Sequence, residues 1–205
     1  EAKEGHKLTK KILVTGSARL DVYRYGGDSL QGRYHHFHLM PFTIAELKGR
    51  GAKDLEVLFR LCGFPEPFFG QSQRQLKRWT QEYAQRVFSE DLTTLERGTD
   101  LGSLELLVYR LPDLVGSPLS INSLREDLEL AHKTVSKWLQ IFERLYLVFR
   151  ISPFGMANVK AVKKEQKLYF YNWDMIDNEG PRFENMVAVH LLKYVYWLQD
   201  SEGRR

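Results

Sequence analysis

Apolar residues recur every three or four positions over most of the chain, and this spacing predicts a mostly helical protein. Two short runs rich in β-branched and aromatic residues, 147–151 and 167–172, predict strands. Pro112 is expected to bend or end the helix that contains it. The fold class that follows is α+β and mostly helical. The expected helices lie around residues 76–87, 101–115, 122–128, 133–145 and 182–198.

Four of the five expected helices place a set of apolar side chains on one face. These sets are Leu76, Trp79, Tyr83 and Val87; Leu104, Leu107, Val108 and Leu111; Val135, Trp138, Leu139 and Phe142; and Val187, Leu191, Val195 and Leu198. The aromatic residues near the second strand, expected to pack in the core rather than to stack bases, are Tyr169, Tyr171, Trp173 and Phe183.

The first third of the chain predicts shorter elements. KILVTG (11–16) has the pattern of a short buried strand, and residues 33–39 have an extended pattern that ends before Pro41. Thr43, followed by Glu46 three residues later, predicts a capping box at the start of a short helix. GFPEPFFG (63–70) contains two Pro and two Gly, which indicates a loop and a domain boundary.

Between residues 122 and 172, the predicted order is helix, helix, strand, basic loop and strand, which is typical of a winged helix-turn-helix. This order predicts binding of duplex DNA by the second helix and by the loop. Both are rich in basic and polar residues, which are the types that contact phosphates and base edges. Acidic residues nearby favour an alternative, a winged helix that binds protein or acts as a lid. The candidate DNA-binding residues are Lys133, Ser136, Lys137, Gln140 and Arg144 on the helix and Lys160, Lys163 and Lys164 in the loop.

Composition narrows the possible chemistry. The formal net charge of +4 and the sequence pI near 9.1 permit an acidic partner without requiring one. A single cysteine, Cys62, excludes a disulfide within the chain, indicates a cytoplasmic setting and is expected to be a buried, inert thiol. On a strand, His36 and His38 would share a face and His35 would point the other way, so these two lack a nearby third ligand. No metal site is therefore expected, and the three histidines are interpreted as strand residues. No apolar run is long enough to span a membrane.

Five segments, in chain order, resemble a family of bacterial and archaeal proteins. The segments are KILVTGSARLDV, DSLQGRYHHFHLMPFTIAEL, GFPEPF, KLYFYNWDMI and RFENMVAVHLLK. In that family an AAA+ (P-loop) ATPase domain is followed by a winged helix and a nuclease-like domain with a PD-(D/E)xK core. The resemblance covers residues 11–193. It implies a remnant of the ATPase domain at 1–50, a helical connector and winged helix at 51–165, and the start of the nuclease-like domain at 166–205.

The resemblance also implies nucleotide-sensing roles for Ser17, at the polar sensor position, and for Arg33, where a charge-stabilising arginine is expected. The alternatives are a helix cap and a surface ion-pair partner. The full-length family uses ATP and magnesium, but this chain has no GxxxxGK[ST] loop and no strand that ends in paired acids. We therefore expect no catalytic residue and no cofactor in this chain. Glu184 alone does not make a metal site and is expected to be structural.

Two interpretations of function follow. The first is a non-catalytic fragment of an AAA+ family ATP-binding protein, and the second is a DNA-binding winged-helix module that works without ATP hydrolysis. Without parallel neighbours, the KILVTG strand would expose its edge. Self-association through this strand, or disorder up to about residue 45, is therefore expected.

Overall fold

The computed structural model describes residues 13–16, 35, 37–49, 51–86, 100–154 and 166–203. This part of the chain is α+β and mostly helical, as predicted. No helix in these ranges is both long and apolar enough to cross a lipid bilayer. The elements are η2 (Ile44–Glu46), α1 (Ala52–Leu61), α2 (Pro65–Gly70), α3 (Gln73–Arg86), α5 (Leu101–Arg110), η4 (Leu111–Leu114), α6 (Ile121–Asp127), α7 (His132–Arg144), β1 (Val148–Ile151), β2 (Lys167–Phe170), η5 (Trp173–Met175) and α9 (Glu179–Glu202).

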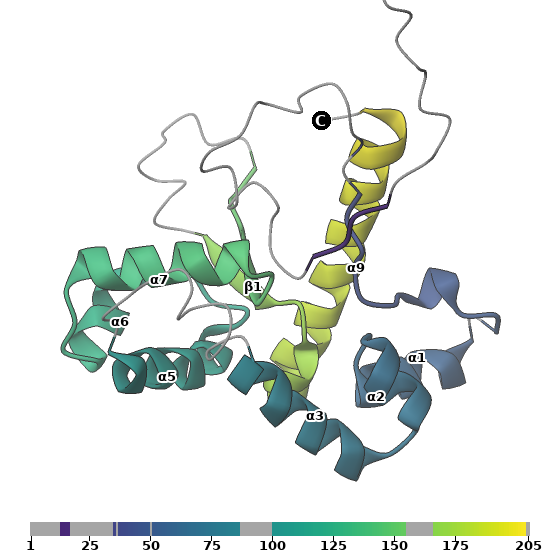
Figure 1. Ribbon diagram of the computed structural model, residues 1–205, viewed down its shortest axis with the longest axis horizontal. Coiled ribbons are helices and arrows are strands. Elements are labelled where there is room, and N and C mark those ends of the chain that lie inside the picture. The colour runs from purple at the N-terminus through teal and green to yellow at the C-terminus, as the bar shows by residue number, and fades with distance from the viewer. Residues whose placement is uncertain are drawn as a thin grey trace, which may run out of the picture.

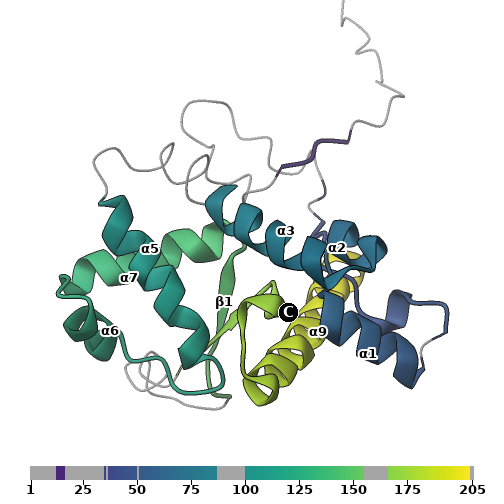
Figure 2. The same ribbon diagram turned by 90° about the horizontal axis from the view of Figure 1, so that it is seen from below.

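The helices form two groups on either side of α9 and the strands. Helices α5, α6 and α7 gather at one end, and α1 and α2 gather at the other (Figure 1). The view from below shows the same division, with α3 running between the two groups (Figure 2). The last helix therefore lies centrally, where it can contact elements from both halves of the sequence.

The two strands pair antiparallel, with Val148 opposite Phe170 and Ile151 opposite Lys167. The Asn185 side chain, from α9, closes the outer edge of β2. Its Oδ1 accepts the Phe170 N–H at 2.7 Å, and its Nδ2 donates to the Phe170 carbonyl at 2.7 Å. Asn185 is fully buried and takes the place that a third strand would occupy.

One contiguous apolar core runs through the molecule, from Met40 to Val189. Its largest fully buried side chains include Trp173, Phe142 and Phe170. The predicted core packing is confirmed for Tyr169, Tyr171 and Trp173. It is wrong for Phe183, which is 47% exposed and packs edge-on against Phe59 at the surface.

Helix ends follow the expected polar and proline signals. Thr43 and Glu46 form the predicted contact, in which the Thr43 N–H donates to Glu46 Oε2 at 2.9 Å. Asp100 begins α5 by accepting the Gly102 N–H at 3.1 Å. Pro112 ends α5 as predicted, and the chain continues as the short helix η4.

Residues 63–70 correct the prediction of a loop, because Pro65 to Gly70 form helix α2. Pro65 and Pro67 both lie in the first turn, where a backbone N–H has no partner inside the helix. Neither proline therefore removes a helical hydrogen bond. Pro67 and Phe68 are buried, so this segment joins the core rather than separating two domains.

The prediction of a buried strand at KILVTG is also wrong for the residues that the structure describes. Leu13 is 87% exposed and Val14 is 68% exposed, and residues 13–16 belong to no strand. A strand needs a paired neighbour, and the described ranges place none beside this segment. Residue 35 and residues 37–43 likewise lie in no strand.

Helix α9 is longer than predicted and faces the other way. Val187, Leu191 and Val195 lie on one side, but that side is 40%, 61% and 45% exposed. The buried side instead carries Asn185, Met186, Ala188 and Val189. Because α9 is apolar on most of its circumference, periodicity alone did not reveal which side is covered.

Candidate nucleic-acid interface

Helix α7 has one strongly apolar face, and that face is covered. Val135, Trp138, Leu139 and Phe142 are buried, as predicted. They pack against α6 on one side and β1 on the other. This packing fixes the helix along its length, so the residues on its opposite face have defined positions.

The opposite face of α7 is polar and exposed. Lys133, Lys137, Gln140 and Arg144 are exposed, whereas Ser136 is half-buried with its Oγ 3.3 Å from His132 Nδ1. From the first of these residues to the last, the stripe is about 16 Å long at 1.5 Å per residue. The five α7 residues predicted from the sequence to bind DNA therefore all lie on this side of the helix.

Three of the acidic residues near α7 are engaged with basic partners. Glu143 accepts two hydrogen bonds from Arg150, at 2.8 and 2.7 Å, and this pair connects α7 to β1. Asp127 lies 3.5 Å from Arg110, and Glu126 lies 3.1 Å from Arg125. These ion pairs offset much of the negative charge that would otherwise oppose a polyanion at this surface.

The predicted DNA-binding residues of the hairpin loop, Lys160, Lys163 and Lys164, lie outside the described residues. Lys167, at the start of β2, donates to Glu184 at 3.1 Å. The Tyr169 hydroxyl donates to the same carboxylate at 2.8 Å. Burial opposes ionisation of Glu184, but the hydrogen bonds from Tyr169 and Lys167 outweigh it and lower the pKa of this carboxyl. Glu184 thus connects α9 to β2 through Lys167 and Tyr169.

The other candidate sites are located as follows. Ser17, Arg33 and His36 lie outside the described residues. His35 is exposed, and in the described ranges no group of three or more His, Cys, Asp or Glu side chains could hold a metal ion. Cys62 is fully buried, and burial raises the pKa of its thiol to about 12, as expected of an inert thiol.

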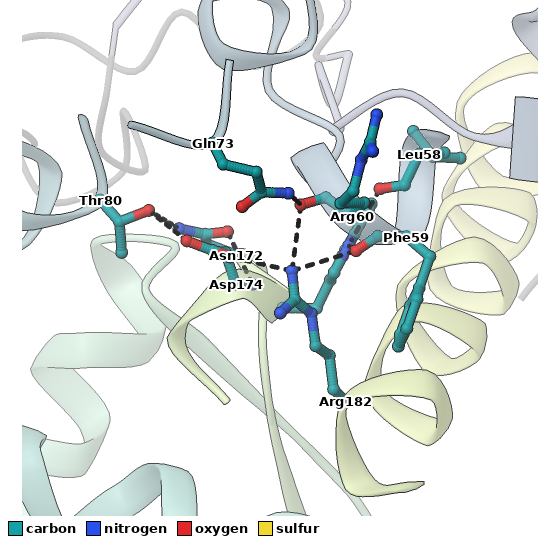
Figure 3. A network of polar contacts seen from close by, with 9 residues as sticks. Leu58, Phe59, Arg60, Gln73, Thr80, Asn172, Asp174 and Arg182 are labelled. Carbon is teal, nitrogen blue, oxygen red and sulfur yellow. Dashed lines mark hydrogen bonds and ion pairs between the residues drawn. The ribbon is translucent and has the colours of Figure 1, made fainter. Parts of the chain in front are cut away.

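A polar cluster that the sequence did not reveal closes the end of α1 (Figure 3). One nitrogen of Arg182, Nη2, donates to the Phe59 carbonyl at 3.1 Å, the Arg60 carbonyl at 3.3 Å and Asp174 Oδ1 at 2.9 Å. Trp173 Nε1 lies 3.3 Å from the Leu58 and Phe59 carbonyls. These contacts satisfy carbonyls that have no partner inside the helix.

Two further side chains complete this cluster, which we call the Arg182 cluster. Gln73 donates to the Arg60 carbonyl at 3.0 Å, and Thr80 donates to Asp174 Oδ2 at 2.8 Å. Both come from α3. The cluster therefore joins α1, α3, η5 and α9, and its chemistry is that of a structural junction. No local sequence pattern marks these residues as one cluster, because they lie far apart in the chain.

Three relatives show the scale of the similarity between this chain and known proteins. "Uncharacterized protein Rv2008c" of Mycobacterium tuberculosis and "Uncharacterized protein Mb2031c" of Mycobacterium bovis are each 23% identical over 163 residues, which are 79% of this chain and 36% of the relative. "Uncharacterized protein MJ1637" of Methanocaldococcus jannaschii is 25% identical over 138 residues, 67% of this chain and 24% of the relative. The chain thus spans between about a quarter and about a third of the length of these relatives.

No solved structure shows significant similarity to this chain. A protein-family model, described as "Domain of unknown function (DUF8612)", matches residues 52–173. This match begins at the first residue of α1 and ends at Trp173, so it includes α7, both strands and much of the Arg182 cluster. It covers more than half of the chain, which therefore belongs to the DUF8612 family.

Proposed function

We propose that this chain binds duplex DNA, with α7 as the recognition helix of a winged helix-turn-helix. The observation that carries the proposal is the division of α7 into a buried apolar face and an exposed face with three basic side chains, Lys133, Lys137 and Arg144. A helix of this kind, fixed on one side, can enter the major groove of B-form DNA.

The elements around α7 support the same proposal. Helix α6 precedes it across a tight turn in which Glu129 has a left-handed backbone, with φ of 54°. The antiparallel strands β1 and β2 follow it directly. This order and pairing support a winged helix-turn-helix, in which the second helix would contact the bases and the hairpin would contact the neighbouring backbone.

Fluorescence anisotropy of a labelled duplex over a salt series tests the proposal. We expect binding whose log K falls linearly with log salt. In the double variant Lys133→Ala, Lys137→Ala, the slope should become shallower by about 2, because two phosphate contacts are lost. The affinity at low salt should fall at the same time.

The matched control is the double variant Lys53→Ala, Lys77→Ala, which removes the same charge from exposed positions on α1 and α3. It should bind as the wild type does. Equal losses in the two double variants would mean that net charge, rather than α7, governs binding. Absence of binding at low salt would overturn the proposal and favour a winged helix that contacts protein.

A second proposal is that the chain forms a non-catalytic part of an AAA+ family ATP-binding protein. It is supported by the five segments that resemble that family in order, and by the greater length of the relatives, of which this chain spans 24% to 36%. Purified chain should then turn over no ATP. Measured ATP turnover that scales with protein concentration would contradict this proposal.

A further inference from the structure

Residues 37–47 lie against the C-terminal half of α9, and we call them the strap. His38 holds one end. Its backbone N–H donates to Asp200 Oδ2 at 2.9 Å, and its Nδ1 lies 3.1 Å from the same oxygen. The imidazole also stacks on Tyr196, with ring centroids 3.9 Å apart. The expectation of disorder up to about residue 45 is therefore wrong for residues 37–45.

The other end of the strap is held by Lys193 and by the turn after α1. Lys193 Nζ donates to the Pro41 carbonyl at 2.9 Å and forms an ion pair with Glu46. The Phe42 N–H donates to the Gly63 carbonyl at 2.6 Å. A Cβ at Gly63 would lie 2.6 Å from the Trp173 ring, so only glycine fits where the strap passes.

Between these two ends, the strap is bound to a single imidazole. His190 Nε2 accepts the Ile44 N–H at 3.1 Å, and Nδ1 lies 2.8 Å from the Met186 carbonyl. An amide N–H needs a lone pair on Nε2, and a carbonyl needs a proton on Nδ1. One neutral tautomer satisfies both contacts. The imidazolium would direct an Nε2 proton at the Ile44 N–H, so that donor would face donor.

The surroundings of His190 favour its neutral form. Burial lowers its pKa below the ordinary value of 6.5, and the positive charge of Lys193 on α9 adds to this effect. The Met186 carbonyl and the carboxylate of Glu46 on η2 act in the opposite direction without cancelling it. Trp173, with its ring centroid 6.2 Å away, adds no charge.

We propose that the strap is a pH-sensitive latch, in which protonation of His190 releases the Ile44 amide and loosens residues 37–47 from α9. The sign follows from the lowered pKa. The latch contributes fully above the unfolded value near 6.5, and its contribution is lost as the pH falls through the folded value. His38 differs, because its Nδ1 can donate to Asp200 whether or not the ring is protonated.

Amide hydrogen exchange followed by NMR, with a parallel titration of the histidine ring signals, tests this latch. Between pH 7.5 and 5.5 we expect the protection factor of the Ile44 amide to fall by up to about tenfold, because the released imidazole has its ordinary pKa near 6.5. Its chemical shift should follow the ring signals of His190 with a common midpoint. In His190→Gln the amide side chain can both donate and accept, so protection at Ile44 should persist and should no longer depend on pH.

His38→Gln is the matched control, since it alters the other histidine that holds the strap. It should leave the pH dependence at Ile44 in place, although overall protection falls. Unchanged protection at pH 5.5, or a midpoint at Ile44 that differs from that of the His190 ring, would overturn the latch. Because both measurements use the wild-type chain, this conclusion does not depend on the folding of either variant.

Discussion

The Arg182 cluster and the exposed face of α7 are both built from charged and amide side chains, but their hydrogen-bonding groups are directed differently. In the Arg182 cluster, the donors that have partners end mainly on carbonyls and a carboxylate inside the protein, whereas Arg182 Nε is buried without a partner among the described residues. The side chains of Arg182 and Asp174 are only 18% and 12% exposed. On α7, Lys133 and Arg144 point to solvent. Residue type alone did not separate a structural junction from a candidate binding surface.

The comparison shows that the destination of each hydrogen bond distinguishes the two roles. A buried charge that loses its partner costs far more free energy than an exposed one, because water cannot replace the lost contact. Substitutions in the Arg182 cluster should therefore change stability and leave DNA affinity unaltered. Substitutions on α7 should do the reverse. Three further variants test this division.

The largest effect is expected from Arg182→Leu. The variant leaves the Asp174 carboxylate buried without its ionic partner and leaves the Phe59 and Arg60 carbonyls with fewer donors. We expect a loss of about 3 kcal/mol in the free energy of unfolding, measured by urea denaturation. The folded fraction should bind DNA as the wild type does. A loss of DNA affinity at unchanged stability would contradict the division.

Asn185→Leu should come next, because it removes both partners of the Phe170 backbone at the outer edge of β2. Each buried group left unsatisfied costs about 1 kcal/mol or more, so we expect a loss of about 2 kcal/mol of stability in the same urea assay. Asn185→Asp keeps one acceptor and should keep the hydrogen bond from the Phe170 N–H. If both variants were as stable as the wild type, the role of Asn185 as a substitute strand would be wrong.

Glu143→Gln should have the smallest effect and is informative because Glu143 lies where the two kinds of role meet. It belongs to α7 but is bound to Arg150 on β1, in a pair that is 26% and 17% exposed. Replacing it weakens a charge-assisted contact by about 1 kcal/mol and removes one negative charge beside the basic face. We expect slightly lower stability together with DNA binding that is tighter by a few-fold in the anisotropy assay. Weaker binding would show that the pair orients α7.

Local patterns predicted the parts of the fold that depend on local physics. The spacing of Val135, Trp138 and Phe142 was sufficient to find the buried face of α7, and Pro112 marked the end of α5. Helix α2 was missed because Pro65 and Pro67 look like helix breakers unless the first turn begins at Pro65 itself. The number of Pro and Gly residues in the segment does not show where the first helical turn begins.

The contacts made between distant residues could not be predicted. Nothing in the sequence around Phe59 or Arg60 indicates that their carbonyls are bound by Arg182, 123 and 122 residues away. The strap is a similar case, since Ile44 and His190 are 146 residues apart. The five residues of the candidate DNA-binding face, by contrast, lie on a single helix. Helical periodicity alone was therefore enough to predict that they share one side.

The long separation in the Arg182 cluster has a consequence for the order in which this protein matures on the ribosome. Helix α1 is synthesised first, and the Trp173 side chain that contacts its last carbonyls follows 115 residues after Leu58. At typical rates of chain elongation this interval lasts roughly 6–20 seconds. Throughout it, the Leu58 and Phe59 carbonyls lack the donors that Trp173 and Arg182 later supply, so we expect the nascent chain to be vulnerable to proteolysis near Phe59.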